Sequence, residues 1–316
     1  MTETLFHAYL PLLLWTGLGL ILFRLMPEAF PRILGRSLYW VGVPLEILAL
    51  ARQTDFAGNA GWAPVITAGA IIMGFTLAWL SLQIWQHFAK GKANSPSWLQ
   101  DRSSQGSFIL SAMLGNTGFV GLAIIPSLIS DHYLGWAIFY SVTQNVIGTY
   151  GLGVFIASYF GRPSSANHWW IQIRDILSVP SLWAFTIGFL TRSVVLPVPV
   201  ESGLHACIRL VIPGAFVLMG MRLSQIKGWK SFKIALLPAV LKVVVMPGLL
   251  GIALTLLGFT GDPRLALVLM SGMPSAFAGL ILAEEYNLDR EITASSIVIT
   301  TGLLLLMIPI WLVLYS

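Results

Sequence analysis

Charged residues are scarce in this chain. Of 316 residues, 18 are Lys or Arg and 13 are Asp or Glu, so that 10% are charged and 56% are hydrophobic. About a quarter of the residues are charged in an ordinary soluble domain. A soluble protein of this composition would expose very large apolar patches. A bilayer solvates apolar surface, so the composition predicts one integral membrane domain over residues 1–316.

Sequence signals for enzymes and for disulfides are also missing. The one cysteine, Cys207, lies in an apolar segment and has no partner for an internal disulfide. The sequence has no paired-histidine metal motif, no G-x-S-x-G motif and no Walker motif. We therefore expect neither an enzyme nor an ATP-driven pump, and no cofactor or metal site. The N-terminus lacks the basic region and cleavage site of a signal peptide, so its first apolar stretch is expected to remain as a span.

Long apolar stretches follow one another along the whole chain. A spanning helix needs roughly twenty mostly apolar residues. Ten stretches meet this requirement: residues 5–26, 36–52, 62–88, 106–130, 133–160, 172–192, 202–223, 232–258, 264–284 and 292–315. The predicted fold class is therefore an all-α integral membrane protein of about ten transmembrane helices.

The basic residues of the loops separate onto two sides of the membrane. With the N-terminus outside, the inner loops carry Arg24, Arg32, Arg36, Lys90, Lys92, Arg102, Arg162, Arg174, Arg222, Lys227, Lys230, Lys233 and Arg290. The outer loops carry Arg52, Arg192 and Arg264. Lys and Arg are more frequent in the cytoplasmic loops of membrane proteins, so this distribution predicts that both termini are outside. It also explains the basic excess without a nucleic-acid partner.

Two halves of the chain carry similar motifs, which predicts two five-helix repeats at about residues 5–160 and about 172–315. The fourth span contains GNTGFVG at residues 115–121, and the ninth contains GMPSAFAG at 272–279. Because five is odd, the second repeat must enter the membrane from the opposite side. This is the inverted repeat of many secondary transporters.

Helix-weakening residues gather near the middle of the fourth and ninth spans. Inside a helix, glycine costs about 1 kcal/mol and proline about 3 kcal/mol. A single one is more often a close-packing or kink position, but a pair at corresponding places predicts discontinuous helices around a substrate site. Backbone amides freed at a half-helix N-terminus favour an anion. The predicted substrate-binding residues are Gly115, Asn116, Thr117, Pro274, Ser275 and Ala276.

These motifs resemble those of the auxin efflux carrier family, which includes plant auxin exporters and many bacterial carriers. The matching segments are GNTGFVGL at 115–122, MPSA at 273–276, LAEEY at 282–286, and Lys242, Pro247 and Pro309. The resemblance covers essentially the whole chain, including the number of spans and the outside position of both termini.

The resemblance implies a crossed-helix fold shared with bile-acid symporters and sodium/proton antiporters. Helices four and nine would break and cross, spans one, two, six and seven would form a scaffold and homodimer surface, and the rest would move as an elevator. In the plant carriers an asparagine beside the first crossing helps to hold the substrate carboxylate, and Asn116 matches it, as Pro274 matches a crossing proline. This chain differs at Gly115, where the plant carriers have proline, and at Ala123 and Ala278, where many relatives have proline and asparagine.

Three ionisable residues fall inside predicted spans, where charge is costly and often functional. Glu46 is expected either to carry a coupling proton or to pair with Lys242 or Arg209. Lys242 is expected to attract an anion, to stand in for a bound cation, or to extend to the inner interface. Arg209 is expected on the scaffold or dimer face. Gln144 and Asn145 either support a broken helix, coordinate an ion or bond to a neighbouring helix.

The sequence thus predicts a secondary active or facilitative transporter of a small organic anion, auxin-like or another carboxylate, in the plasma or inner membrane. Two alternatives stay open: a sodium- or proton-coupled symporter of the bile-acid carrier type, with H⁺ or Na⁺ as coupling ion, and a non-transporting receptor. A cation antiporter is disfavoured, because spans three, four, five, eight, nine and ten have no acidic residue at mid-depth.

Overall fold

The computed structural model describes residues 2–53, 59–89, 96–162, 169–225 and 230–316. These residues form helices and short connections, and their one β-type pairing is an isolated bridge between Gly115 and Ser275. The helices of the first half are α1 (Thr2–Leu25), α2 (Phe30–Ser37), η1 (Leu38–Gly42), α3 (Val43–Gln53), η2 (Asn59–Trp62), α4 (Ala63–Ala89), η3 (Ser97–Leu99), α5 (Arg102–Met113), η4 (Thr117–Gly121), α6 (Leu122–Ile124), η5 (Ile125–Ser127), η6 (Asp131–Tyr133), α7 (Leu134–Thr143), η7 (Gln144–Gly153) and α8 (Val154–Gly161). Those of the second half are α9 (Trp169–Leu177), α10 (Pro180–Leu190), α11 (Val198–Ser224), α12 (Lys230–Val240), η9 (Leu241–Val245), α13 (Met246–Leu256), α14 (Gly261–Ser271), α15 (Phe277–Glu285) and α16 (Arg290–Tyr315).

Several of these helices are long and apolar enough to cross a membrane, which confirms a multi-pass membrane protein. Five qualify alone, and a sixth is a pair bent by 56°. They are 30–52, 60–89, 198–224, 231–256, 290–315 and the pair 170–177 with 180–190. The other four predicted spans do not meet this criterion within the described residues, so the count of ten stays a prediction. Lys90, Lys92 and Lys227 lie outside the described residues.

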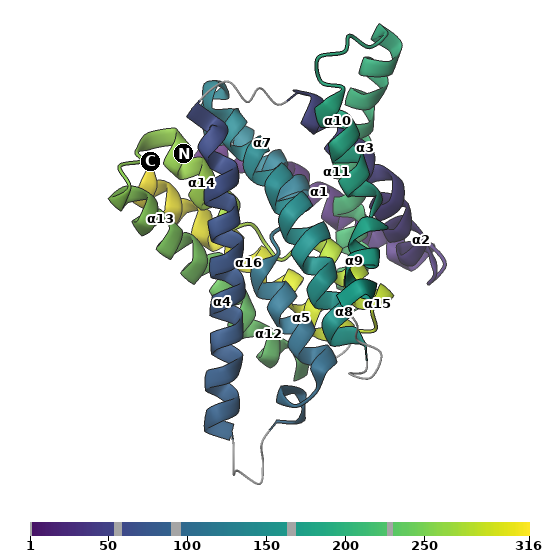
Figure 1. Ribbon diagram of the computed structural model, residues 1–316, viewed down its shortest axis with the longest axis vertical. Coiled ribbons are helices and arrows are strands. Elements are labelled where there is room, and N and C mark those ends of the chain that lie inside the picture. Colours follow the sequence, from purple (N-terminus) through teal and green to yellow (C-terminus); the bar gives the residue numbers. More distant parts are fainter. Residues whose placement is uncertain (1, 54–58, 90–95, 163–168, 226–229) are drawn as a thin grey trace.

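The helices form two groups that lie side by side (Figure 1). In the scaffold group, which we define as α1, α2, η1, α3, α10 and α11, α1 packs along α11 and α3 packs on α10 and α11. The crossing group comprises α4 to α8 and α12 to α16 with their short helical turns. Its core surrounds α14, where residues 265–270 are buried. The scaffold group contains the predicted spans one, two and seven and part of span six, and their role as a scaffold stays a prediction.

The contact between α1 and α11 depends on two glycines. A Cβ at Gly220 would overlap the carbonyl oxygen of Thr16, and one at Gly19 would overlap that of Val217. Small residues let membrane helices approach until their backbones touch. The closest contact inside the scaffold group is thus a backbone contact.

Two aspartates fix the helices that lead to the crossing. Asp101 caps α5, accepting hydrogen bonds from the N–H groups of Ser103 and Ser104 at 3.4 and 3.1 Å, and Asp289 caps α16 in the same way. Partial burial acts to raise the pKa of Asp101, but the hydrogen bonds from Ser103 and Ser104 hold that pKa below its ordinary value. Ser107 Oγ donates to the carbonyl of Asp289 at 2.7 Å and ties α5 to α16.

Both predicted helix breaks are present, and they meet. α5 ends at Met113 before η4 begins, and α14 ends at Ser271 before α15 begins. The Asn116 N–H donates to the Pro274 carbonyl at 2.7 Å, and the Ala276 N–H donates to the Leu114 carbonyl at 3.0 Å. Backbone groups inside a membrane must be paired within the protein. Each break therefore satisfies polar groups of the other.

Candidate functional site

A cavity lies at the helix crossing, between the scaffold group and the crossing group. The scaffold group contributes Leu38, Tyr39, Val43, Glu46, Ala215 and Leu218. The crossing group contributes Gly115, Asn116, Gly118, Phe119, Asn145, Tyr150, Ala276, Phe277, Ala278 and Ile281. Residues far apart in the sequence thus form one mostly apolar chamber with a few polar groups, which is the usual character of a small-molecule site.

Asn116 is the polar residue at the first break, and its two amide atoms have different environments. Its Oδ1 accepts a hydrogen bond from the Phe119 N–H at 3.3 Å, which makes Asn116 the N-cap of η4. Nδ2 donates to no protein atom among the described residues, although Asn116 lines the cavity. The cap fixes the side chain, so that its NH₂ group is available to a bound molecule.

Two helices begin at this cavity, and their positive ends converge there. Gly118 and Phe119 belong to the first turn at η4, and Phe277 and Ala278 to the first turn of α15. The first N–H groups of a helix have no partner within it, and Ala276, the N-cap of α15, has no side chain that could accept from them. Partial positive charge from both ends therefore faces the chamber.

The other predicted residues of the breaks support the crossing rather than line the chamber. Ser275 Oγ donates to the Ser111 carbonyl at 2.7 Å, and the Ser275 N–H donates to Thr300 Oγ1 at 3.0 Å. Pro274 supplies the carbonyl that pairs with Asn116. Thr117 is buried, and its Oγ1 has no hydrogen-bond partner among the described residues.

Gln144 and Asn145 begin η7, a π-helical segment, and face different surroundings. Gln144 Nε2 donates to the carbonyl of Met113, the last residue of α5, at 3.4 Å. Gln144 thus supports the broken helix, one of the predicted roles. Asn145 lines the cavity, where a Cβ at Gly118 would lie 3.2 Å from its Nδ2.

Lys242, in η9 of the crossing group, contacts both breaks. It is fully buried, and its Nζ donates to the carbonyl of Ser271, the last residue of α14, at 2.8 Å. A Cβ at Gly115 would lie 3.0 Å from the same Nζ. The ammonium therefore balances the negative end of α14, and the alternative in which Lys242 extends to the inner interface is wrong.

Glu46 lies on the scaffold wall of the cavity. It is 2% exposed, and its Oε1 accepts no hydrogen bond within the described residues. No ion pair joins it to Lys242 or Arg209 among those residues, and Arg209 is exposed on α11. The predicted alternative of a structural partner for these cations is therefore wrong, and Glu46 faces the chamber unpaired.

Three ion pairs that sequence reasoning missed lie at the predicted cytoplasmic side. Arg222 of α11 pairs with Glu284 of α15 at 2.7 Å, and Arg36 of α2 pairs with Glu285 at 2.7 Å. Both pairs connect the scaffold group to the second broken helix. The third joins Arg162 to Asp175 at 2.7 Å.

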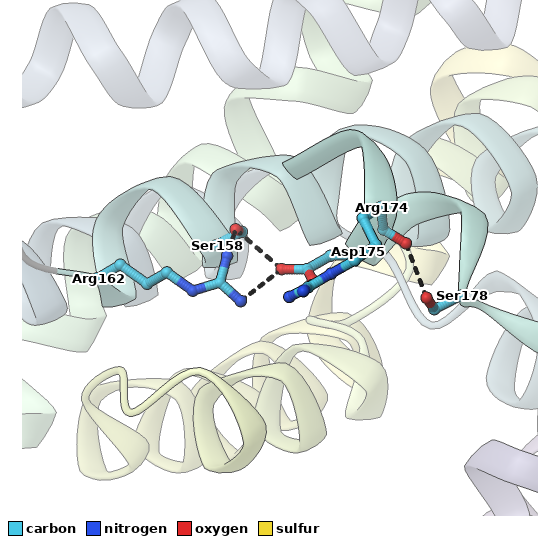
Figure 2. Close-up of polar contacts among 5 residues, drawn as sticks. All are labelled: Ser158, Arg162, Arg174, Asp175 and Ser178. Atoms are coloured by element: carbon cyan, nitrogen blue, oxygen red, sulfur yellow. Dashed lines mark hydrogen bonds and ion pairs between the residues drawn. The ribbon is translucent and has the colours of Figure 1, made fainter. Parts of the chain in front are cut away.

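The third pair fixes the end of α8 against α9 (Figure 2). Asp175 also accepts from Ser158 Oγ at 3.1 Å, and Arg174 reaches its other oxygen at 3.4 Å. Ser178 Oγ donates back to the Arg174 carbonyl at 2.7 Å. These contacts tie the last helix of the first half of the chain to the first helix of the second half.

Comparison with known proteins gives consistent matches. The family model described as "Membrane transport protein" matches residues 168–312. An uncharacterized transporter of Methanothermobacter thermautotrophicus is 26% identical over 313 residues, which cover 98% of this chain and 97% of that protein. An uncharacterized transporter of Methanocaldococcus jannaschii is 28% identical over 218 residues, which cover 65% of this chain and 67% of that protein.

Proposed function

We propose that this chain is a membrane transport protein of the auxin efflux carrier family and that it transports a small organic anion. The observation that carries the proposal is the convergence of two helix N-termini and the Asn116 amide on one buried cavity. Such groups hold a carboxylate without a full positive charge beside it. A neutral solute would leave the partial positive charge of both helix ends uncompensated.

The proposed mechanism is alternating access of the elevator type. In it, the chain forms ten transmembrane helices in two inverted repeats, and the crossing group carries the substrate along a fixed, dimeric scaffold group. The cavity supports this mechanism because each of the two groups supplies part of its wall. Inverted repeats with broken helices at the substrate site are common in secondary transporters.

Solute counterflow in proteoliposomes tests the proposed function. Liposomes are preloaded with an unlabelled carboxylate and diluted into a trace of the same labelled compound. A transporter exchanges the two and accumulates label transiently, whereas a receptor of the same fold binds label without accumulation. A panel of small carboxylates that gives no counterflow would contradict the proposal.

The proposed orientation places both termini outside the cytoplasm, in the plasma or inner membrane. A reporter that is active only in the periplasm, fused after Ser316 in a Gram-negative host, is expected to be active because an even number of spans follows an outside N-terminus. A reporter that is active only in the cytoplasm should be silent at the same position. The reverse pattern would remove the ten-span count and with it the inverted repeat.

The ion pair of Arg222 with Glu284, on the predicted cytoplasmic side, is expected to stabilise the conformation seen here, because it joins the scaffold group to α15. Their side chains are only 14% and 11% exposed. Glu284→Gln should destabilise this conformation by about 1–3 kcal/mol, between the values for exposed and fully buried pairs. The measurement is the rate at which an impermeant maleimide, added on the cytoplasmic side, labels Ala278→Cys in a Cys207→Ser background. Glu284→Gln should increase this rate.

A matched pair of residues provides the control. Arg36 and Glu285 make the same kind of contact, but their side chains are 50% and 35% exposed. Glu285→Gln should therefore change the labelling rate much less, because an exposed pair contributes at most about 1 kcal/mol. Equal effects of the two substitutions would show that the Arg222–Glu284 pair does not set the conformational balance.

A further inference from the structure

Glu46 places a carboxylate in the cavity. A simple organic anion bound there would make no use of this carboxylate. Glu46 Oε1 is buried without a hydrogen-bond partner among the described residues, in the cavity that Gly118 and Asn145 also line. A Cβ at Gly118 would lie 3.7 Å from this oxygen, so the carboxylate is close to the helix N-terminus at which we place the substrate. Two carboxylates in one small apolar chamber repel each other, unless a cation or donor lies between them.

The occupied cavity must therefore supply a partner for Glu46. A buried carboxylate without a partner is costly, and the cost is removed by protonation or by pairing and hydrogen bonding. Among the described residues no cation lines the cavity, since Lys242 is not one of its lining residues and its Nζ donates to the Ser271 carbonyl. A proton or a cationic group of the substrate would supply the partner.

The residues around Glu46 indicate which kind of partner fits. Tyr39 and Tyr150 line the same cavity, with ring centroids 5.6 Å apart at an interplanar angle of 68°. A carboxylate beside aromatic rings is the chemistry that recognises an ammonium group, through charge pairing and cation–π attraction. A metal ion would need several oxygen ligands, and no group of three or more His, Cys, Asp or Glu occurs among the described residues.

We propose that the transported anion also carries a protonated amine, so that the substrate is a zwitterion of the amino-acid class. Its carboxylate lies at Asn116 and at the first turns of η4 and α15, and its ammonium lies at Glu46 beside Tyr39 and Tyr150. The apolar remainder contacts Leu38 and Phe277. This inference rests on the proposed function and narrows its substrate class.

Calorimetric titration of the purified full chain with matched ligand pairs tests the inference. L-leucine and 4-methylpentanoate differ only in the ammonium group, as do L-phenylalanine and 3-phenylpropionate. The amino acid is expected to bind about tenfold or more tightly than its partner, the effect of one hydrogen bond to a charged group. A desamino acid that binds as tightly as its amino acid, or more tightly, would overturn the inference without any variant.

Glu46→Gln provides the second measurement, because glutamine keeps the size of the side chain and removes its charge. It should abolish the preference by weakening amino-acid binding about tenfold or more. The desamino acids should bind as tightly as before or more tightly, because repulsion by the Glu46 carboxylate is removed. Glu28→Gln, an exposed site before α2, should retain the full preference. A preference that survives in Glu46→Gln would overturn the assignment of the ammonium to this residue.

Counterflow distinguishes failure of this inference from failure of the proposed function. Exchange of 4-methylpentanoate or 3-phenylpropionate without exchange of either amino acid would overturn the zwitterion while the anion transporter stands. Exchange of the amino acids, lost in Glu46→Gln, would support both. Absence of exchange for every carboxylate tested would contradict both.

Discussion

Replacement of Asn116 by alanine is expected to weaken binding of the transported carboxylate by about ten- to a hundredfold. The reason is that Nδ2 is a fixed, unused donor on the cavity wall. Loss of a hydrogen bond to a charged group costs roughly 1.5–3 kcal/mol, which corresponds to that change in affinity. Calorimetric titration of the purified protein with a substrate identified by counterflow measures the effect.

Two other substitutions at this position separate binding from folding. Alanine also removes the cap of η4, which costs about 1 kcal/mol of stability. Aspartate keeps an oxygen that can accept from the Phe119 N–H but adds a negative charge, so Asn116→Asp should be as stable as the wild type and bind more weakly than alanine. Asn116→Ser keeps capping ability without the amide donor. Wild-type affinity in a stable Asn116→Ala protein would place the substrate elsewhere.

The second large effect is expected at the contact of α1 with α11. A Cβ at Gly220 would overlap the Thr16 carbonyl and lie 2.8 Å from the Cα of Gly19. Backbone atoms cannot rotate away as a side chain can, so the two helices must separate. Gly220→Ala should cost about 1–3 kcal/mol, the usual cost of overpacking, and Gly220→Leu should leave little folded protein. Thermal unfolding in detergent, followed by size-exclusion chromatography, measures both.

Gly203 provides the matched control, because it lies on the same helix with nothing within 4 Å of an added Cβ. Gly203→Ala should be neutral or slightly stabilising, since alanine is the better helix former. If Gly220→Ala unfolded at the same temperature as Gly203→Ala, the close backbone approach would not be a source of stability in the scaffold group.

The sequence located the helix breaks because glycine and proline are conspicuous inside apolar spans. The chain leaves its helices at residues 114–116 and 272–276, which overlap the predicted positions 115–117 and 274–276. The sequence alone could not show that Glu46 and Asn145 share a cavity with Asn116, because the depth of a residue in a span does not tell which way its side chain points around the helix axis. For the same reason, the sequence could not distinguish Tyr39 and Tyr150 from aromatic residues of the core.

The sequence also could not predict the ion pairs between residues that are far apart in the chain. Glu284 and Glu285 lie next to each other in the sequence, yet they bind arginines on different helices, and Arg36 is 249 residues from Glu285. A charged residue at a helix end is expected wherever water is near, and nothing local indicates its partner.

The reciprocal hydrogen bonds of the two breaks have a consequence for biogenesis. Leu114 and Asn116 enter the membrane long before the ribosome has made Pro274 and Ala276, which complete their backbone pairing. During that interval the first half of the chain holds polar backbone groups that neither lipid nor its own helices can satisfy. Backbone pairing at the first break is therefore completed only after the second half of the chain has been inserted.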